Sequence, residues 1–575
     1  MDYLKTYERW LSTEATDEST KKELLFIKNN EEEIKERFYK DLEFGTAGLR
    51  GIIGAGSNRM NIYTVRLATQ GLCEDIKNSG EEAVKKGVVI AYDSRHKSKE
   101  FAMESAKVLA ANGIKAYVFD ELRPTPELSF AVRHLGCARG IVITASHNPK
   151  EYNGYKAYGE DGGQLPPKSS DYVISIISKT DIFDDVKVMD EAQAIDKGLI
   201  EIIGEEVDKV YLENVYKQSV TTKAIETLGE DFSVIYSPFH GTGNKLVRAI
   251  LKKIGVKDLR IVKEQELPDP DFSTVKSPNP EEKAGFSYAI EMAKEKKADL
   301  IFATDPDADR IGAIVTDKNG EFVCLTGNQM GVLLSEFILR NKKLDGSLNS
   351  KGAIIKTIVT TSMLYPIAKD FGIKIHDVLT GFKYIAELIK DFEENDFYNE
   401  FLLGFEESYG YLAGTYARDK DAVVASMLIT EMAADYKAKG MTLYDGLISL
   451  YEKYGYFMEK TVSYTFAGIE GSEKIKSIMD FFRTTPPKEF AGMKVNRMWD
   501  VKKGIIKDFE NGTEEKLNLP SSDVFRYDLE NNSWFAVRPS GTEPKIKFYF
   551  GVCENSYAKS EAKIEECIAE LSKIV

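Results

Sequence analysis

The sequence lacks several features that mark common classes of protein. Its five cysteines are scattered through 575 residues and form no CxxC pair, which predicts reduced thiols rather than a disulfide framework. No apolar run approaches the roughly 18 residues that a membrane-spanning helix needs. The first residues show no charged-then-apolar signal pattern. We therefore expect a cytoplasmic protein that does not bind membranes.

The chain also has fewer basic than acidic residues. The 77 Lys and Arg residues are outnumbered by 92 Asp and Glu residues, which gives a formal net charge of −15. Because nucleic acids are bound by basic surfaces, no nucleic-acid partner is expected. In so acidic a chain, arginines and lysines inside glycine-rich loops become the main candidates for binding an anion.

Three frequent catalytic signatures are missing. No Gly-x-x-x-x-Gly-Lys-(Ser/Thr) segment is present, so ATP binding by a P-loop is not expected. The segment Gly241-Thr-Gly243 lacks the third glycine of a dinucleotide fingerprint, which argues against a nicotinamide cofactor. The absence of Gly-x-Ser-x-Gly argues against a serine hydrolase.

The length excludes a single hydrophobic core, because a chain of 575 residues normally divides into several domains. Composition and strand patterns place boundaries near residues 210, 325 and 455. The expected domains are residues 1–210, 211–325, 326–455 and 456–575.

Three segments repeat one plan, in which an apolar strand leads through a polar loop to an amphipathic helix that ends at Gly-(Ile/Val)-Lys. The three strands and closing glycines are 87–92 with Gly113, 232–236 with Gly255, and 353–359 with Gly372. A glycine in this place suits the left-handed end of a helix, and a second strand follows each one. Strand–helix–strand units of this kind predict mainly parallel sheets.

The last 120 residues follow a different pattern. The runs 461–466, 534–537 and 545–550 are strand-like, and helices are expected near 473–482 and 557–574. This pattern predicts an α+β domain with an antiparallel sheet.

Polar loops follow later strands of the three repeated units. They are Thr144-Ala-Ser-His-Asn-Pro149, Asp305-Pro-Asp-Ala-Asp-Arg310 and Gly404-Phe-Glu-Glu-Ser408. In open α/β sheets, ligands bind outside the carboxyl ends of the strands. These three loops are therefore the first candidates for a functional site.

The first two loops together indicate phosphoryl transfer. A serine hydroxyl such as Ser146 needs help from a base or a metal to react, and three clustered carboxylates need a cation, for which an all-oxygen set favours Mg²⁺. Both loops have other interpretations. The sequence Ser-His-Asn often only builds a turn. The segment Asp305–Asp309 could be a solvated acidic turn or could contain the nucleophile of an aspartyl phosphotransferase. An EF-hand is excluded, because Arg310 and Thr316 stand where Gly and Glu are required.

Three further segments suit a phosphorylated sugar. Gly45-Thr-Ala-Gly-Leu-Arg-Gly51 forms a possible anion-binding turn beside Arg50, and Arg538-Pro-Ser-Gly-Thr-Glu-Pro-Lys545 offers backbone amides, two hydroxyls and two cations to a phosphate. Glu406, Glu407 and Ser408 suit sugar hydroxyls. Each segment also has a simple structural alternative. The alternative is a flexible turn for residues 45–51, a hairpin turn for residues 538–545, and a polar surface for residues 406–408.

With these loops in this order, the chain resembles the α-D-phosphohexomutase family, which includes phosphoglucomutases and phosphomannomutases. The resemblance covers essentially the whole length. It implies an α/β fold with three similar mixed α/β domains plus a smaller C-terminal α+β domain around a central cleft. The Glu406-Glu407-Ser408 triplet resembles that of the glucose-type enzymes, although Phe405 replaces a glycine common there. The long segment before Gly45 is similar to that of a second, phosphopentomutase-related subgroup.

The resemblance implies a role for individual residues. Ser146 would carry the phosphoryl group and, with Asp305, Asp307 and Asp309, would hold Mg²⁺. Arg50 and Arg310 would neutralise the transferred group, Lys156 would be the general base, and His147 would relay a proton or be purely structural. The substrate-binding residues implied are Gly381, Lys383, Glu406, Ser408, Arg418, Arg538, Ser540, Gly541, Thr542 and Lys545.

The activity implied is the interconversion of α-D-glucose 1-phosphate and glucose 6-phosphate, with glucose 1,6-bisphosphate as intermediate and activator. Pentose phosphates, mannose phosphates or the synthesis of glucose 1,6-bisphosphate are the alternatives within the family. A metal-dependent aspartyl phosphatase and a silent sugar-phosphate sensor are alternatives from other classes. Small sugar phosphates are the only partners expected, for a monomer or a homodimer.

Overall fold

The computed structural model describes residues 2–45, 48–395, 400–466, 468–540 and 545–575. By its internal contacts the chain divides into two compact units. The first comprises residues 1–316, 322–325 and 409–439, and the second comprises residues 317–321, 326–408 and 440–575. Across the described residues, no helix combines the length and the apolar composition that a membrane span requires.

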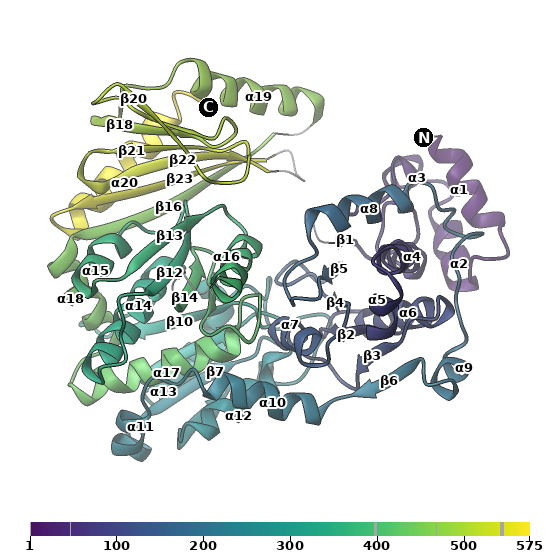
Figure 1. Ribbon diagram of the computed structural model, residues 1–575, viewed down its shortest axis with the longest axis horizontal. Helices are drawn as coiled ribbons and strands as arrows, with labels where there is room; N and C mark the ends of the chain where they lie inside the picture. Colours follow the sequence, from purple (N-terminus) through teal and green to yellow (C-terminus); the bar gives the residue numbers. More distant parts are fainter. Residues whose placement is uncertain (1, 46–47, 396–399, 467, 541–544) are drawn as a thin grey trace. The chain divides into compact units, whose positions relative to one another are not determined.

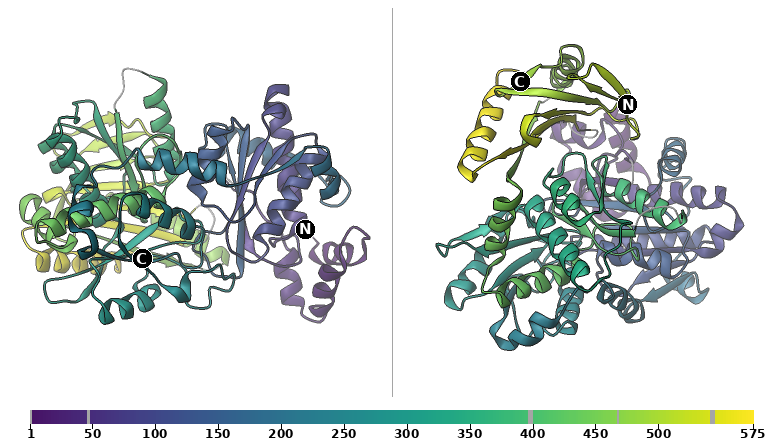
Figure 2. Two further views of the ribbon diagram at one scale, coloured as in Figure 1. Left: turned by 90° about the horizontal axis from the view of Figure 1, so that it is seen from below. Right: turned by 60° about the vertical axis from the view of Figure 1, so that its left-hand side comes forward.

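The first unit begins with three short helices that form a small core of their own. They are α1 (Tyr3–Ser12), α2 (Glu18–Phe26) and α3 (Glu31–Phe38). Trp10 lies at the centre of this core, where its ring meets those of Phe38, Tyr63 and Phe183 edge-on. These aromatic contacts fix the helices beside the first sheet, where Figure 2 shows them in purple.

A mixed six-stranded sheet follows, in the order β1-β5-β4-β2-β3-β6. Its strands are β1 (Gly48–Ile52), β2 (Val88–Tyr92), β3 (Ala116–Phe119), β4 (Arg139–Ile143), β5 (Tyr152–Tyr158) and β6 (Ile200–Ile203). Its helices are α4 (Ile62–Asn78), α5 (Glu81–Lys86), α6 (Ser98–Ala111), α7 (Thr125–His134), α8 (Pro167–Ile177) and α9 (Glu191–Asp196). β2, β3, β4 and β6 run parallel, whereas β5 is antiparallel to both β4 and β1.

The second sheet of the first unit has the order β11-β10-β9-β7-β8. Its strands are β7 (Ser233–Ser237), β8 (Asp258–Ile261), β9 (Leu300–Thr304), β10 (Ile311–Thr316) and β11 (Phe322–Cys324). The helices of this region are α10 (Glu205–Tyr216), α11 (Lys223–Leu228), α12 (Gly243–Lys253), α13 (Ser287–Glu295) and α17 (Ala422–Ala438), the last preceded by the short strand β15 (Gly410–Leu412). α17 packs against α11 and α12, so a late segment of the chain completes an early domain.

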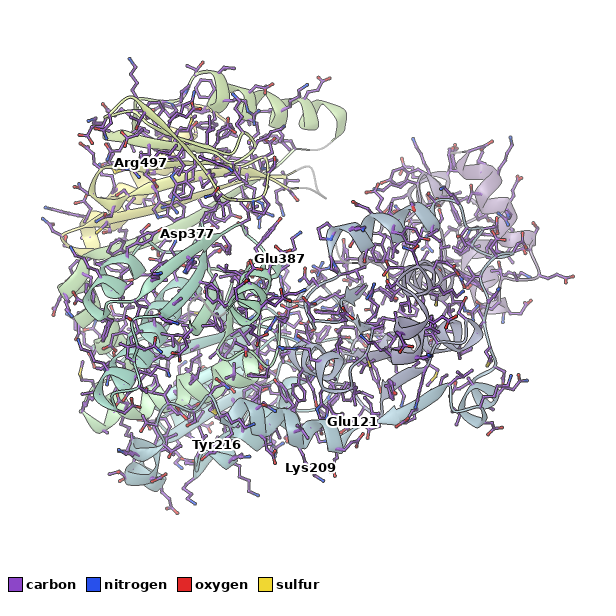
Figure 3. All side chains as sticks on the ribbon, in the orientation of Figure 1. Glu121, Lys209, Tyr216, Asp377, Glu387 and Arg497 are labelled. Carbon is purple, nitrogen blue, oxygen red and sulfur yellow. The ribbon has the colours of Figure 1, made fainter. Side chains whose placement is uncertain are left out.

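The second unit contains the third parallel strand–helix–strand repeat and the C-terminal domain. β12 (Gly352–Thr357) lies between β13 (Lys374–Val378) and β14 (Glu400–Glu406) and is parallel to both. The helices of this part are α14 (Gly327–Leu344), α15 (Leu364–Phe371), α16 (Phe382–Glu394) and α18 (Leu443–Tyr454). Asp377 of β13 is labelled in Figure 3.

The C-terminal domain is an antiparallel sheet in the order β16-β23-β22-β21-β18-β19-β20, with β17 paired to β18. The strands are β16 (Tyr456–Thr465), β17 (Glu489–Phe490), β18 (Met493–Asp500), β19 (Ile505–Asp508), β20 (Thr513–Lys516), β21 (Phe525–Leu529), β22 (Trp534–Pro539) and β23 (Lys545–Glu554). α19 (Gly468–Thr484) and α20 (Tyr557–Leu571) cover the face that carries Phe535 and Phe548, while Trp534 and Tyr549 pack on the opposite face against Ile358. Figure 1 shows this sheet in green to yellow.

The predicted fold class is confirmed, with three mixed α/β domains and a C-terminal α+β domain. The three predicted repeats are β2-α6-β3, β7-α12-β8 and β12-α15-β13. Gly113, Gly255 and Gly372 close the helices with φ of 74°, 95° and 70°, the left-handed backbone that only glycine adopts at little cost. The antiparallel pairing of β16, β22 and β23 confirms the prediction for the C-terminal part.

Candidate active site

Ser146 lies in a tight loop directly after the buried strand β4. Its φ is 52°, a left-handed value that is uncommon for a residue other than glycine. The backbone N–H of Ser146 donates to the Thr144 hydroxyl at 2.9 Å, and that hydroxyl donates to Oδ2 of Asp93 at 2.7 Å. The strained turn is therefore held by buried hydrogen bonds to the neighbouring strand, as is common at functional positions.

Arg95 fixes the same loop from behind. Its buried guanidinium donates to the backbone carbonyls of Ser146 at 2.6 Å, Pro149 at 2.8 Å and Tyr152 at 3.1 Å, and also to that of Asn148. Four acceptors on one planar cation leave the loop little freedom. No role was predicted for Arg95 from the sequence; it lies in the polar loop that follows β2.

The three predicted aspartates meet directly after β9. One carboxylate oxygen from each of Asp305, Asp307 and Asp309 lies within 4.8 Å of the others, and all three side chains are buried. Oδ1 of Asp305 accepts the backbone N–H of Asp309 at 3.1 Å and of Arg310 at 3.0 Å. These two bonds fold the loop back on itself, which brings the alternate carboxylates to one place.

The serine loop and the aspartate loop are in direct contact. Ser146 Oγ donates to Asp305 Oδ2 at 2.7 Å, and His147 Nδ1 lies 3.1 Å from the same Oγ. Thr125, the first residue of α7, adds a hydrogen bond from its hydroxyl to Asp307 Oδ2 at 3.0 Å. Thr125 was not predicted as a site residue, because nothing in the local sequence marks it as a neighbour of Asp307.

Two lysines balance part of the negative charge. Lys156 Nζ lies 2.7 Å from Asp307 Oδ2 and 3.4 Å from Asp309 Oδ2, and Lys420 Nζ lies 3.2 Å from Asp309 Oδ2. Burial opposes the charge on Lys156, but the two aspartates outweigh it and raise the pKa of its ammonium group. Lys156 is therefore held as a cation in this arrangement.

The aspartates themselves respond differently to their surroundings. Burial, followed by the nearby Asp307 and Asp309 charges, raises the pKa of Asp305 well above its usual range. Burial also acts on Asp307, but the Lys156 ammonium group overcomes it and lowers the pKa of that carboxyl. Such opposed shifts are expected where like charges share a buried site.

The aspartate cluster fits a divalent cation. Oδ1 of Asp307 and Oδ1 of Asp309 are buried and accept no hydrogen bond from any residue that the structure describes. Arg310 Nε lies 3.8 Å from Oδ1 of Asp309, too far for a hydrogen bond. Buried carboxylate oxygens that accept no hydrogen bond are costly, and an all-oxygen donor set suits hard cations such as Mg²⁺, Mn²⁺ or Ca²⁺.

The side chains around Ser146 make His147 a neutral residue. Burial, followed by the charges of Arg310 and Arg50, lowers the pKa of His147 to about 2. Arg310 donates to Glu281 Oε1 at 2.8 Å, and Arg50 donates to Asn148 Oδ1 at 3.2 Å. The first unit contains the aspartate cluster and all the predicted catalytic residues, which are Arg50, Ser146, His147, Lys156 and Arg310.

Four consecutive charged residues, Arg418-Asp-Lys-Asp421, are also buried in the first unit. The backbone N–H of Arg418 donates to Ser129 Oγ at 2.8 Å, and Asp419 accepts from the Tyr158 hydroxyl at 2.8 Å and from Lys420 Nζ at 3.0 Å. Of these four residues, only Arg418 was predicted as a site residue from the sequence. The one signal for Lys420 was a run of four charges immediately before the apolar helix α17.

The predicted sugar loop lies in the second unit, at the end of β14. Oε1 of the buried Glu406 accepts the backbone N–H of Gly381 at 2.9 Å, so two predicted substrate-binding residues are joined. Glu407 Oε2 accepts from the hydroxyl of Thr357 at 3.2 Å and from that of Thr360 at 3.3 Å. Ser408 follows and is partly exposed.

The remaining predicted residues also belong to the second unit. Lys383 Nζ lies 4.7 Å from the ring centroid of Tyr384. Arg538 lies near the end of β22, and the N–H of Ser540 donates to the carbonyl of Lys545 at 2.7 Å, at the start of β23. Gly541 and Thr542 lie outside the described residues, as do Thr46 and Ala47 of the Arg50 loop.

Comparison with protein families gives four successive matches. Phosphoglucomutase/phosphomannomutase alpha/beta/alpha domains I, II and III match residues 41–182, 209–320 and 326–454. The C-terminal domain of the same family matches residues 485–570.

Individual proteins agree with these matches. A phosphoglucomutase of Staphylococcus saprophyticus is 39% identical over 94% of this chain and 96% of its own length. A putative phosphomannomutase of Thermus thermophilus superposes with a TM-score of 0.68 at 20% identity, over 93% of this chain and 99% of its own. Parafusin, a phosphoglucomutase of Paramecium, gives the same score and identity over 93% and 95%. The chain belongs to the phosphoglucomutase/phosphomannomutase family, the α-D-phosphohexomutases.

Proposed function

We propose that this protein is a phosphoglucomutase that interconverts α-D-glucose 1-phosphate and glucose 6-phosphate through a phosphoserine at Ser146. Membership in the family makes it a phosphohexomutase, an isomerase. The observation that carries the assignment of Ser146 is its 2.7 Å hydrogen bond to Asp305 within the buried aspartate cluster.

The reaction begins with phosphorylated Ser146. The free hydroxyl of the bound sugar phosphate attacks the phosphorus, a new P–O bond to the sugar forms, and the bond between phosphorus and Ser146 Oγ breaks. The product is glucose 1,6-bisphosphate, and the hydroxyl proton passes to a base. After the bisphosphate turns over in the site, the other phosphoryl group returns to Ser146 and the second monophosphate leaves.

The residues around Ser146 divide this work. Arg50 and Arg310 neutralise the phosphoryl oxygens, and Arg95 holds the loop carbonyls so that Oγ stays in place. Lys156 is the base for the hydroxyl proton once its ammonium group has released a proton to water, which requires that its ion pairs with Asp307 and Asp309 are weakened first. His147 is neutral, because burial lowers its pKa to about 2, and it orients Oγ.

The metal is proposed to be Mg²⁺, held by Asp305, Asp307, Asp309 and the serine-borne phosphate. When bound, it would draw charge from the phosphoryl group and so favour in-line transfer. The Oδ1 atoms of Asp307 and Asp309, which are buried and accept no hydrogen bond from the described residues, support this assignment.

The second unit supplies sugar and phosphate recognition in this proposal. Glu406 and Ser408 form hydrogen bonds to sugar hydroxyls, and Gly381 and Lys383 also bind the substrate. Arg418, which belongs to the first unit, is a further substrate-binding residue in this proposal. Arg538, Ser540, Gly541, Thr542 and Lys545 bind the phosphate that does not react. Glucose is favoured over mannose and pentose, because relatives at 36–39% identity are named phosphoglucomutases. We also propose a cytoplasmic enzyme that is a monomer or a homodimer.

Parallel rate measurements test the substrate. Glucose 1-phosphate, mannose 1-phosphate and ribose 1-phosphate are compared with Mg²⁺ and a trace of glucose 1,6-bisphosphate. We expect kcat/KM for glucose 1-phosphate to exceed the others by more than about tenfold, or about 1.4 kcal/mol in transition-state binding. A preference for ribose or mannose would overturn glucose as the substrate, and release of inorganic phosphate without isomerisation would overturn the mutase.

A further inference from the structure

Each carboxylate of the aspartate cluster has one oxygen that hydrogen bonds within the protein hold. In Asp305 this oxygen is Oδ1, which accepts the backbone N–H groups of Asp309 and Arg310, whereas Oδ2 faces Ser146. In Asp307 and Asp309 it is Oδ2, which meets side chains from other segments of the first unit. The Oδ1 atoms of Asp307 and Asp309 are buried and accept no hydrogen bond from the described residues. Asp307 and Asp309 thus each keep one oxygen for a metal.

Thr125 holds Oδ2 of Asp307. Its side chain is buried, its hydroxyl donates to this oxygen at 3.0 Å, and its backbone N–H donates to the Asp307 carbonyl at 2.9 Å. Lys156 Nζ lies 2.7 Å from the same oxygen. Because Thr125 binds both the backbone and the carboxylate of Asp307, it fixes the loop and also the rotation of the carboxylate.

Lys420 holds Oδ2 of Asp309 in a similar way. Its Nζ lies 3.2 Å from that oxygen and 3.0 Å from Oδ1 of Asp419, and its side chain is buried. The backbone N–H of Ala422, at the start of α17, donates to the carbonyl of Ala308 at 3.1 Å. The segment that carries Lys420 is therefore bound to the aspartate loop through both backbone and side chain.

These hydrogen bonds restrict how the two carboxylates can bind a cation. Ca²⁺ takes about six to eight oxygen ligands and accepts carboxylates through both oxygens, whereas the smaller Mg²⁺ requires a nearly ideal octahedron. A carboxylate whose second oxygen is held by a hydroxyl or an ammonium group offers a single oxygen. Such a site cannot supply extra ligands by rotating its carboxylates, and so it disfavours Ca²⁺.

We propose that Thr125 and Lys420 are positioning residues that make Asp307 and Asp309 bind metal through one oxygen each and thereby select Mg²⁺ over Ca²⁺. This inference rests on the proposed function, in which the aspartate cluster holds a divalent cation. Hydrogen-bonding partners of metal ligands typically change metal affinity by about 10–100-fold when they are replaced. Lys156 contributes to the same arrangement, but it is also the proposed base, so Thr125 and Lys420 are the residues to vary.

Calorimetric titrations of the full chain test the selection without substrate or turnover. Mg²⁺ and Ca²⁺ are each titrated into the wild type, Thr125→Val and Lys420→Met, and the quantity compared is the ratio of the Kd for Ca²⁺ to the Kd for Mg²⁺. Both ions carry the same charge, so loss of the Lys420 charge shifts the two affinities alike and largely cancels in this ratio. Thr125→Val changes no charge and nearly keeps the side-chain volume. Thermal melts show whether each variant is folded.

Two matched controls make the same chemical changes away from the aspartates. In Thr69→Val the lost hydroxyl is also buried, but it donates to the carbonyl of Val65 within α4 at 2.8 Å. In Lys437→Met the lost ammonium group is also ion-paired and lies on α17, but its partner is Asp299, at 2.7 Å. Thr125→Ser is the rescue variant, because its hydroxyl can donate to the same oxygen of Asp307.

The wild type should bind Mg²⁺ more tightly than Ca²⁺, and the ratio should fall by about tenfold in Thr125→Val and in Lys420→Met. Both controls and Thr125→Ser should keep the wild-type ratio. An unchanged ratio in folded Thr125→Val and Lys420→Met, with Mg²⁺ still bound by the wild type, would overturn the selection and leave the proposed function intact. A wild type that binds neither ion would overturn the metal site of the proposed function and this inference together.

Discussion

Ser146 Oγ donates a 2.7 Å hydrogen bond to Asp305 Oδ2, although 159 residues separate the two in the chain. Each residue follows a buried strand, β4 for Ser146 and β9 for Asp305, and the two strands belong to different sheets. Two α/β domains of the first unit therefore meet at the carboxyl ends of their strands. This contact links the hydroxyl of Ser146, the proposed phosphoryl carrier, to the aspartates that we propose as metal ligands.

Replacing Arg95 by lysine should slow catalysis more than it weakens substrate binding. Lysine keeps the charge but cannot donate in a fork to the carbonyls of Ser146, Pro149 and Tyr152. We expect kcat to fall by at least about tenfold, or about 1.4 kcal/mol, with a small change in KM. Steady-state kinetics on the folded variant measure both.

Arg260→Lys is the matched control for Arg95→Lys. Arg260 also donates to two backbone carbonyls, those of Lys296 and Lys297, but on the surface of the second sheet. Its replacement should leave kcat unchanged. Equal kcat values for the two variants would show that Arg95 does not hold the catalytic loop.

Mg²⁺ should stabilise the wild type but not the variant Asp309→Asn. A ligand that binds only the folded state adds about 2.7 kcal/mol at a concentration of about 100 Kd, which raises the melting temperature by a few degrees. Asp309→Asn removes one of the three clustered carboxylates. Thermal melts with and without Mg²⁺ measure the difference, and chelation of the metal should abolish activity.

Asp317→Asn is the control for the metal prediction, because Asp317 caps an exposed turn nearby in the sequence. It should lower stability slightly and keep the full response to Mg²⁺. The metal assignment fails if Asp309→Asn also responds to Mg²⁺ as strongly as the wild type does.

The buried carboxyl of Glu431 should make the free energy of unfolding depend on pH. Burial raises the pKa of Glu431 from 4.5 to about 7, although its carboxyl accepts hydrogen bonds from Ser219, Val220 and Thr221. Because the folded pKa is the higher one, the stabilising proton is fully present below about pH 4.5 and is lost as the pH rises through about 7. This loss is at most on the order of 3 kcal/mol.

The test of Glu431 compares denaturant unfolding of the wild type and Glu431→Gln between pH 4.5 and 8. Glutamine cannot ionise, so the variant should gain stability relative to the wild type up to about pH 7 and then stay level. Glu226→Gln, an exposed change on α11, should run parallel to the wild type. A constant difference between Glu431→Gln and the wild type would mean that this carboxyl does not titrate in the window.

The sequence predicted the local elements well, because strand, helix and closing glycine are encoded within some 30 residues. It also predicted that Ser146 and Asp305 serve one site, since each loop follows an apolar strand. The sequence did not predict Thr125 and Lys420 as site residues, because their contacts with Asp307 and Asp309 depend on how distant segments pack. The packing of residues 409–439 with the first unit has no local signal, and it is what buries Lys420 beside the aspartates.

Phosphorylation of Ser146 is the central claim and can be measured directly. The wild type, Ser146→Ala and the control Ser175→Ala are incubated with glucose 1,6-bisphosphate labelled with ³²P. The Ser175 hydroxyl lies on α8 and donates to the carbonyl of Tyr172 in the same helix. Each protein is then digested, and the labelled peptide is identified by mass spectrometry. We expect label on Ser146 in the wild type and in Ser175→Ala, and neither label nor mutase activity in Ser146→Ala. Label on another residue, or full activity of Ser146→Ala, would contradict it.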